Sequence, residues 1–494
     1  MITSFSATNF RPFEVSGRLP IVPLTCLVGR NSSGKSSIIQ ALFLLRQSIE
    51  QRVLGARVPQ LILNGPLLDA GSFEDIVYRH ENEREMIFSL EMNIDFSFAR
   101  SSKLAAGGLI ELDIPRPPES RFWLPAIHSA QFLQQRRKMQ ARKVFVSFSF
   151  RQEPPFGPTL SRLEFEVENL GNATFVRTTA EQRVQHWRTY LEGIPRRSVE
   201  LFFPRWSFFP SLSERPGRIR SLTQQQKRQI NEFVAFAQLA ILDIHSFLYG
   251  LRLLGPFRTP PARRYTFSGL GAVDTGINGE RAVDLLITDR LLRPGREQLK
   301  TAVSYWLKKL GLARSVTVKD LTRKSNIFEL AIGGAGTARW ANFADVGFGV
   351  SQVLPVLVQG FLVPRGGTYV VQQPELHLHP DAQAGLADFF IYLASQGVQS
   401  IVETHSEYLL LRLRRRLAER LKTLKIGLQG EKDGYIQELD KNSVSVVYLD
   451  ESSGGAKLVP LEIGDSFQFE NLPQGFMTQS IDDRLALMKA LRRK

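Results

Sequence analysis

The sequence predicts an α/β fold, in which both chain ends build one mixed sheet flanked by helices and a β-rich and helical insertion separates them. Three observations predict it. An apolar strand near the N-terminus leads into a glycine-rich loop and an amphipathic helix. From Asn326 onward, strand-like and helix-like segments alternate, which is typical of a parallel sheet covered by helices. Between these parts lie strand patterns punctuated by proline.

The N-terminal part is expected to form strands, a loop and a helix over residues 1–50. The segments ITSFSATNF and FEVSG are short and rich in aromatic, Thr and Ser residues, and LTCLVG is an apolar strand that ends in glycine. After the loop RNSSGKSS, apolar residues recur at Ile38, Leu42, Leu45 and Ile49. This spacing indicates a helix with one buried face.

The insertion is expected to be β-rich first and helical afterwards. The segments MIFSLEMNIDFSF, GLIELDI, VFVSFSF and LEFEVENL are strand-like. Leu163 to Glu168 alternate with period 2, as in a half-exposed antiparallel strand. The basic segment at residues 131–143 is a helix or a loop. Helical patterns follow at residues 223–254 and 295–312, and the proline-rich segment PFRTPPARRYTFSGLGAV between them is a loop.

The C-terminal part alternates between strands and helices. The predicted strands are IFELAIG, TYVVQQ, QSIVETHS and SVSVVYLD, and a terminal helix is expected in SIDDRLALMKALRR. We therefore divide the chain into the N-terminal part of the head at 1–84, the insertion at 85–320, the C-terminal part of the head at 321–450 and an extension at 451–494.

The composition indicates a globular protein, which we expect in the cytoplasm. The chain has 494 residues, of which 43% are hydrophobic, enough for a sizeable core. The single cysteine, Cys26, excludes an internal disulfide and fits a reducing compartment; its apolar surroundings predict an inert buried thiol. The N-terminus has no signal-peptide pattern. Phe233 to Leu254 is the most apolar stretch, but charged residues such as Asp243 interrupt it, so we expect no membrane span.

The net charge of +15 is either an aid to solubility or the mark of a polyanionic partner such as nucleic acid. Two clusters are candidates for salt-dependent contacts to a nucleic-acid backbone, and a solvated helix face explains either cluster equally well. They comprise Arg136, Arg137, Lys138, Arg142 and Lys143, and Arg412, Arg414, Arg415 and Arg416. Arg263 and Arg264, in the proline-rich loop, are candidates for contact with a nucleotide or a partner subunit.

The strongest local signal is the segment from Gly29 to Ser36, which matches G-x-x-x-x-G-K-[ST] in full. Backbone N–H groups of such a loop surround phosphate oxygens, and the following helix adds its positive end. Lys35 is expected to reach the β- and γ-phosphates, and the Ser36 hydroxyl to bind magnesium. We therefore predict a site for ATP and Mg²⁺ formed by Arg30, Asn31, Ser32, Ser33, Gly34, Lys35, Ser36 and Ser37.

A phosphate loop of this kind needs an acid at the end of a neighbouring strand to hold the metal. The apolar strand TYVVQQPE is the only one followed by a suitable cluster, yet the two expected places carry the amides Gln372 and Gln373. His405, in the next strand segment, would lie beside the γ-phosphate if the two strands are neighbours.

A second glycine-rich loop, ADVGFGVSQ at residues 344–352, carries a serine at the start of a helix, which is another anion-binding arrangement. One phosphate site does not need two such loops. If the second loop acts on a partner's nucleotide, the molecule is a head-to-tail homodimer with ATP between its subunits.

The ordered set GRNSSGKSS, VGFGVSQ, VVQQPELHLHP and ETHS resembles the ATP-binding-cassette-type (ABC-type) ATPases of the RecF, SMC and overcoming-lysogenization-defect group. It is most similar to the stand-alone AAA-like ATPases of bacterial anti-phage systems. The resemblance covers residues 1–80 and 320–450, and the segments LGPFRTPPARRY and GDSFQFENLPQGF also resemble that subgroup. It implies a P-loop NTPase fold of the ABC-ATPase type.

The resemblance also implies roles for single residues. Gly347, Gly349 and Ser351 stand at the signature loop that acts on the partner's nucleotide, and His405 at the switch histidine. Gln372 occupies the position of the magnesium-binding acid, where many relatives have glutamate, and Gln373 the position of the catalytic glutamate of transporters.

These substitutions predict ATP binding with slow hydrolysis. The amide of Gln372 can contact magnesium only weakly, and the amide of Gln373 cannot act as a general base. Glu375 is the remaining acid, and it either polarises water or fixes the loop that follows. Such a glutamine is also what an engineered nucleotide trap would carry.

Two other kinds of site are disfavoured. His377 and His379 form an H-x-H pair, but no cysteine is near, and the resemblance implies a loop at the dimer interface instead of a metal site. A built-in toprim nuclease needs clustered acids after His405, and the acids there lack that spacing.

We therefore expect a dimeric ATP-dependent sensor or scaffold in bacterial anti-phage defence, which controls a separate effector protein and forms, in one variant, a higher oligomer of dimers. The alternative is a RecF-like ATPase that repairs or clamps DNA. ATP-dependent, salt-sensitive DNA binding would favour the alternative.

Overall fold

The computed structural model describes most of the chain. It covers residues 1–50, 59–95, 140–154, 157–178, 186–191, 199–202, 211–214, 223–267, 269, 272–321, 326–334, 339–426, 440–452, 454–465, 467–471, 473 and 488. The expected strand GLIELDI, the basic residues Arg136, Arg137 and Lys138, and nearly all of the expected terminal helix lie outside these residues.

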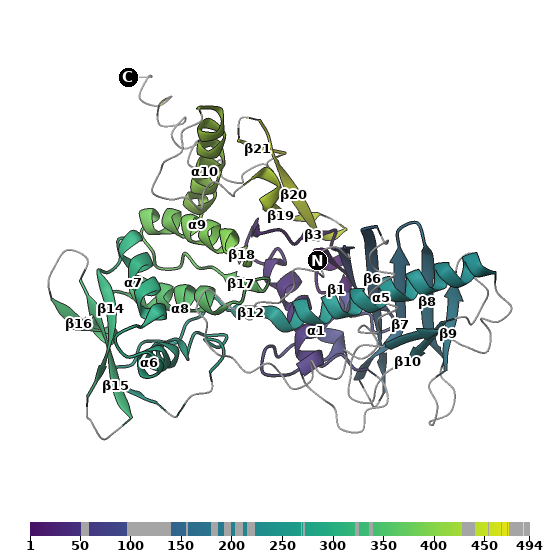
Figure 1. The fold of residues 1–494 in the computed structure, drawn as a ribbon, viewed down its shortest axis with the longest axis horizontal. Helices are drawn as coiled ribbons and strands as arrows, with labels where there is room; N and C mark the ends of the chain where they lie inside the picture. Colours follow the sequence, from purple (N-terminus) through teal and green to yellow (C-terminus); the bar gives the residue numbers. More distant parts are fainter. Residues whose placement is uncertain are drawn as a thin grey trace.

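The main sheet has seven strands in the order β12-β17-β18-β4-β19-β20-β21. The first five are parallel, and the last two are antiparallel, so the sheet is mixed as predicted. Their bounds are β4 (Leu24–Gly29), β12 (Leu251–Leu254), β17 (Thr368–Gln372), β18 (Gln399–Glu403), β19 (Val444–Ser452), β20 (Gly455–Ile463) and β21 (Phe469–Glu470). Because these strands are parallel neighbours, the carboxyl ends of β17, β18 and β4 lie side by side. Figure 1 shows β12, β17 and β18 next to one another.

Both faces of this sheet are buried, which explains why its parallel strands are nearly continuous apolar runs. Val370 and Ile401 belong to a core shared with α1 and the antiparallel sheet. Their neighbours Tyr369 and Val402 belong to a second core, because successive side chains of a strand point to opposite faces. Helices of the second core are α6 (Ala282–Leu292), α7 (Gln298–Lys309), α8 (Phe348–Leu362), α9 (Pro380–Ser395) and α10 (Glu407–Ile426).

An antiparallel sheet forms the other large layer, in the order β2-β1-β5-β6-β7-β8-β9, with β3 beside β1. Its strands are β1 (Ile2–Phe10), β2 (Phe13–Val15), β3 (Leu19–Pro20), β5 (Met86–Ile94), β6 (Arg142–Glu153), β7 (Gly157–Val167), β8 (Gly171–Thr178) and β9 (His186–Leu191). The helices α1 (Lys35–Glu50) and α5 (Gln224–Gly250) pack against it. Short elements follow or connect these strands, namely α2 (Phe73–Ile76), η1 (Tyr78–His80), β10 (Val199–Phe202) and β11 (Ser211–Glu214).

Helix α5 is the one helix of the described part that is long and apolar enough to cross a membrane. Its apolar side chains, including Phe233, Phe236 and Ile244, are buried in the core shared with the antiparallel sheet. The helix begins at a capping box in which Thr223 and Gln226 satisfy each other's backbone N–H groups. Its apolar character is thus explained by packing within the protein.

Three elements differ from the sequence prediction. The segment Leu251–Leu254 was expected to end a helix, but it forms β12, a parallel edge strand of the main sheet. Ile327–Gly333 was expected to begin the parallel sheet, but it forms β15 of a small antiparallel sheet. Its partners are β13 (Tyr265–Thr266), β14 (Ser315–Asp320) and β16 (Trp340–Asn342), and η4 (Phe343–Asp345) leads from this sheet to α8.

The predicted insertion at 85–320 is therefore not one separate block. Strand β12 lies within that range but belongs to the head sheet, and β5 lies within it but pairs with β1 of the N-terminal part. The third difference concerns Arg142 and Lys143, which begin β6 instead of belonging to a basic helix or loop. Short local patterns do not show which sheet a strand will join, because that choice depends on long-range pairing.

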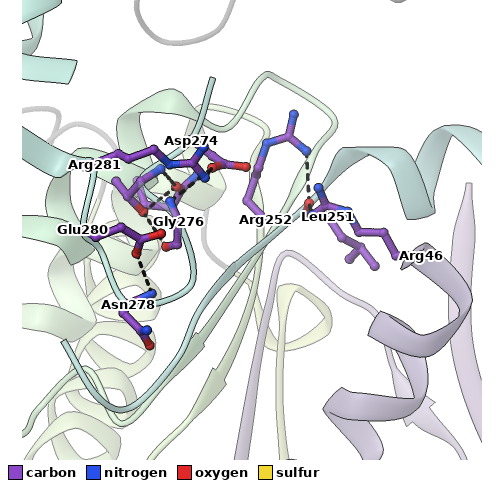
Figure 2. A network of polar contacts seen from close by, with 10 residues as sticks. Arg46, Leu251, Arg252, Asp274, Gly276, Asn278, Glu280 and Arg281 are labelled. Atoms are coloured by element: carbon purple, nitrogen blue, oxygen red, sulfur yellow. Dashed lines mark hydrogen bonds and ion pairs between the residues drawn. The ribbon is translucent and has the colours of Figure 1, made fainter. Parts of the chain in front are cut away.

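The turn between α5 and β12 is tied to the helix that follows the phosphate loop (Figure 2). Arg46 of α1 is buried and donates to the carbonyl oxygen of Leu251, which also accepts from Arg252 at 3.0 Å. The loop after β12 is ordered by the ion pair of Arg281 and Asp274. These contacts hold β12 at the edge of the sheet, next to β17.

The basic run in α10 is occupied by contacts within the chain. Arg412 and Arg416 donate to the buried carboxylate of Asp388 at 2.8 and 2.7 Å. Arg415 pairs with Glu419 at 2.6 Å, and Arg414 donates to a backbone carbonyl oxygen, that of Phe467, at 2.5 Å. Arg412, Arg414 and Arg416 therefore join α10 to α9 and to the C-terminal strands, whereas Arg415 is the exposed member of the run.

Replacing Asp388 by alanine is expected to lower the free energy of unfolding by about 3 kcal/mol, because it leaves the largely buried Arg412 without its carboxylate and Arg416 with Glu419 alone. Arg415→Ala is the control, since it removes an exposed pair worth at most about 1 kcal/mol. Urea unfolding of both variants measures the difference. Equal, small losses would show that the pairing with Asp388 does not hold α10 in place.

Candidate functional site

The loop between β4 and α1 has the backbone of a phosphate cradle. Gly34 has a φ of +97°, and a Cβ atom there would lie 2.8 Å from Pro12, so only glycine fits. Ser33 is 1% exposed and its hydroxyl has no partner among the described residues. Arg30, Asn31 and Ser32 form the exposed tip of the loop.

Lys35 begins α1 and lies along this loop. Its Nζ donates to the carbonyl oxygen of Gly29 at 3.0 Å and to that of Arg30. Burial lowers the pKa of Lys35, and the nearby charges of Glu403 and Glu451 act in the opposite direction. The ammonium group is thus positioned inside the cradle, where a phosphate would replace its carbonyl partners.

The next residue, Ser36, contacts a carboxylate that the sequence analysis did not single out. Its hydroxyl donates to both oxygens of Glu403, at 2.9 and 3.1 Å. Glu403 is the last residue of β18 and is 3% exposed. The segment ETHS contained the signal: an acid that ends the strand between β17 and β4 must lie at the edge where the carboxyl ends meet.

Gln372, at the end of the neighbouring strand β17, also contacts Glu403. Strand β17 pairs with β18 in parallel, with Gln372 opposite Glu403, and the Gln372 Nε2 donates to Glu403 Oε2 at 2.6 Å. The structure therefore brings two of the predicted site residues, Ser36 and Gln372, into contact with Glu403. Ser37, also predicted, follows them in the first turn of α1 and is half-buried.

His405 lies two residues beyond Glu403, and its residue is exposed. The prediction required β17 and β18 to be neighbours, and they are. Burial of the ring and the charge of Lys35 both lower the pKa of His405, so the imidazole is neutral near pH 7. A neutral imidazole can donate or accept a hydrogen bond at one end of the cradle.

Glu375 is buried and held by a hydrogen bond from the protein backbone. It is 7% exposed and accepts from the backbone N–H of His405 at 2.6 Å. Burial raises the pKa of Glu375, while the hydrogen bonds from His405 and Thr404 act in the opposite direction. Of the two roles that the sequence left open, these contacts favour fixing the loop after β17 over polarising water.

Gln373 is held in a left-handed backbone conformation, with a φ of +46°. Its N–H donates to the Glu403 carbonyl oxygen at 2.7 Å. The guanidinium of Arg258, 7% exposed, donates to the carbonyl oxygens of Gln373 and Gln372 at 3.1 and 2.8 Å and to that of Pro256. The sequence analysis quoted the segment that contains Arg258 but gave this residue no role.

The second glycine-rich loop forms the start of α8. Gly347 is the N-cap, and a Cβ on Gly349 would lie 3.2 Å from the carbonyl oxygen of His377. Ser351 lies one turn into the helix, is 2% exposed, and donates its hydroxyl to the Phe348 carbonyl oxygen at 2.8 Å. The accessible groups at this end are therefore backbone N–H groups near Gly347, and not the Ser351 hydroxyl.

Arg263 pairs with Asp345, immediately before this turn, at 2.9 and 2.5 Å. Arg258 and Arg263 thus connect one proline-rich loop both to the end of β17 and to the start of α8. His379 is the N-cap of α9 and accepts from the N–H of Asp381. The described residues contain no group of three side chains suited to a metal site of the His, Cys and carboxylate type.

Cys26 lies in β4 behind the cradle, is fully buried, and has its pKa raised to about 12 by burial and by the charge of Glu375. It is therefore a thiol without ready access to the thiolate form. This agrees with the predicted inert cysteine.

Two family models match the chain. The model described as "AAA ATPase domain" matches residues 1–153, which include the phosphate loop. The model described as "AAA domain, putative AbiEii toxin, Type IV TA system" matches residues 209–412, which include the start of α8, β17 and His405. Together with the sheet topology, these matches confirm the predicted α/β P-loop ATPase fold, and the chain carries AAA-type ATPase domains. No curated protein matches the sequence.

Solved structures of SMC heads cover nearly the whole chain at low identity. One is the SmcHead bound to the C-winged helix domain of ScpA, at 12% identity and a TM-score of 0.44, covering 94% of this chain and 98% of that chain. A second is the Smc head domain with an extended coiled coil bound to the C-terminal domain of ScpA derived from Pyrococcus furiosus. Its identity is 10% and its TM-score 0.41, and the match covers 99% of this chain and 99% of that chain. A third is the SMC head domain from Thermotoga maritima, at 11% identity and a TM-score of 0.35, covering 94% of this chain and 99% of that chain.

Replacing Arg258 by methionine is expected to destabilise the protein by about 1–3 kcal/mol for each buried carbonyl oxygen left without a donor. Arg258→Lys is expected to recover only part of this loss, because an ammonium group lacks the planar fork that spans two acceptors. Chemical unfolding measures both variants.

The control is Arg263→Met, which removes an exposed ion pair and is expected to cost less than about 1 kcal/mol. If Arg258→Met were as mild as Arg263→Met, the proline-rich loop would not fix the end of β17.

Proposed function

We propose that this chain is an ATP- and Mg²⁺-binding ATPase that closes as a head-to-tail homodimer, hydrolyses ATP slowly, and acts as a sensor or scaffold for a separate effector protein in bacterial anti-phage defence. One observation carries the nucleotide part of the proposal. A phosphate loop, a serine–carboxylate contact and His405 meet at the carboxyl ends of three adjacent parallel strands.

The residues present fit a triphosphate and its metal ion. The unpartnered Ser33 hydroxyl, the backbone turn at Gly34 and the positive end of α1 favour phosphate oxygens. Lys35 would hold the phosphates, and the Ser36 hydroxyl would hold the metal ion. A bound Mg²⁺ supplies charge neutralisation for the β- and γ-phosphates.

Slow hydrolysis follows from the shortage of a general base. Gln373 can orient a water molecule but cannot take its proton. Glu375 is buried, and one of its carboxylate oxygens accepts from the His405 backbone N–H at 2.6 Å, which holds it in a structural role. His405 is neutral and can accept a proton, but its switch position suits contact with the γ-phosphate better than abstraction. The chain is therefore suited to hold ATP for longer than an efficient ATPase does.

The strand order supports a nucleotide shared between two chains. Helix α8 packs against β12 and β17, whereas the phosphate loop follows β4, with β18 between. Strands two places apart are separated by about 10 Å. The N–H groups at Gly347 and Gly349 are thus displaced from the phosphate loop of the same chain, and a twin chain can present them to it.

Exposed aromatic residues near these elements support an interface. Phe348, the first residue of α8, is 71% exposed and lies 5.9 Å from the ring of His377. Phe257, next to Arg258, is 81% exposed. Exposed aromatic side chains of this kind are enriched where proteins associate. Dimers could assemble further into a higher oligomer.

The defence role and the effector are supported by the family match of the second half of the chain. The match at residues 209–412 is to a family model whose description includes "putative AbiEii toxin, Type IV TA system". The described residues contain no group of three His, Cys, Asp or Glu side chains that could hold the metal ion of a toprim-type nuclease. A partner chain that carries the toxic activity is therefore part of the proposal, and a cytoplasmic location goes with it.

In native mass measurements, the particle is expected to grow from monomer to dimer when ATP and Mg²⁺ are added. Lys35→Ala is expected to abolish this growth because the triphosphate loses its cation. Phe348→Asp is expected to abolish it as well, because the carboxylate would face the partner's phosphates. An acid in the first turn of α8 suits the helix dipole, so this variant should fold.

Leu292→Asp is the matched control, since Leu292 is also exposed, at 54%, but lies on α6. This variant should dimerise normally. A mass that is independent of nucleotide would contradict the shared site, and ATP-dependent DNA binding that salt abolishes would favour a RecF-like DNA-clamping ATPase instead.

A further inference from the structure

We infer that Glu403 at the end of β18, and not a residue of β17, supplies the carboxylate of the magnesium site. The acid then lies one strand away from the position where the sequence predicts it. This inference rests on the proposed ATP-binding function and deepens it. Gln372, at the position where the sequence predicts the magnesium acid, then positions this carboxylate and is not itself the main ligand.

The first argument is the contact with Ser36. In a phosphate-loop ATPase, the hydroxyl that binds magnesium works together with an acid from a nearby strand. Here the Ser36 Oγ is 2.9 Å from Oε1 and 3.1 Å from Oε2 of Glu403. A metal ion bound to Ser36 would therefore lie within reach of this carboxylate, directly or through a bound water molecule.

The second argument is the backbone around Glu403, which leaves the side chain little freedom. In the main sheet, β18 lies between β17 and β4, and Glu403 pairs with Gln372 on one side and Leu27 on the other. The carbonyl oxygen of Glu403 accepts from the Gln373 N–H at 2.7 Å, and the Thr404 N–H donates to Leu27 at 3.0 Å. The carboxylate therefore projects from a strand end fixed on both sides.

The third argument is charge. The Gln372 amide donates to Glu403 at 2.6 Å and orients it toward Ser36. A glutamate at position 372 would place two carboxylates at this contact, and their repulsion would have to be offset by the metal ion. With glutamine, the site keeps one carboxylate and needs no metal ion to remain in this arrangement.

A consequence is that metal binding and hydrolysis are separated in this chain. The carboxylate at Ser36 preserves the hard oxygen ligand that Mg²⁺ prefers. The position of Gln373 still lacks a base. The inference therefore predicts a normal metal requirement for tight nucleotide binding, together with slow hydrolysis, whereas loss of the acid at 372 alone would predict weak metal binding.

The test measures Mn²⁺ affinity by electron paramagnetic resonance in the presence of a non-hydrolysable ATP analogue, and binding of the same analogue in EDTA. Glu403→Gln is expected to weaken Mn²⁺ binding by at least about 10-fold, the lower end for residues that orient or complete a metal site. Analogue binding in EDTA should be unchanged, because Glu403 does not reach the phosphates in the inference.

Three further variants make the result specific. Glu451→Gln removes another carboxylate whose charge acts on Lys35, and it should leave Mn²⁺ affinity unchanged. The exchange Gln372→Glu with Glu403→Gln keeps one carboxylate at the site and should restore most of the affinity. Glu403→Asp, which keeps the charge but shortens the side chain, should give an intermediate affinity and serves if Glu403→Gln does not fold.

Unchanged Mn²⁺ affinity in Glu403→Gln or Glu403→Asp, with analogue binding intact, would overturn the inference and leave the proposed function standing. An equal loss in Glu451→Gln would also overturn it, because the effect would then be one of general charge. Failure of the unaltered protein to bind the analogue in EDTA and in Mn²⁺ would overturn the proposed function itself.

Discussion

The parallel pairing of β17, β18 and β4 is the constraint on which the rest of the site depends. It places Gln372, Glu403 and the phosphate loop on one edge of the sheet, although the phosphate loop lies more than 300 residues before the other two in the chain. The register is set by apolar side chains that alternate between two cores, so a slip by one residue would exchange the two faces. Packing therefore determines which polar groups meet at the strand ends.

The layers around the main sheet also hold in place the edge at which these polar groups meet. Helix α1 lies between the main sheet and the antiparallel sheet, and Arg46 ties it to the start of β12 (Figure 2). Beyond the other end of β12, Arg258 donates to the carbonyl oxygens of Gln372 and Gln373 at the end of β17. The buried cations thus act as donors to backbone carbonyl groups, and in this way hold the strand ends.

Much of the site could be predicted from local patterns. The motif from Gly29 to Ser36 carries its own geometry, because glycines, a lysine and a serine at fixed spacing determine the loop. The position of Gln372 followed from the apolar strand before it. Glu403 and β12 could not be found in this way, because their roles arise only from strand order. Ser351 matched the signature by sequence, but it lies one turn into α8, where its hydroxyl is buried and donates to the Phe348 carbonyl oxygen.

The central claim is that a triphosphate is bound at this edge of the sheet and covered by a second copy of the chain. A structure determined with a non-hydrolysable ATP analogue and Mg²⁺ tests it most directly. The account predicts phosphates around Lys35, a metal ion between Ser36 and Glu403, and the start of α8 from a twin chain, at Gly347 and Gly349, over the γ-phosphate. A bound analogue elsewhere, or a metal ion far from Glu403 with no twin chain near the phosphates, would contradict it.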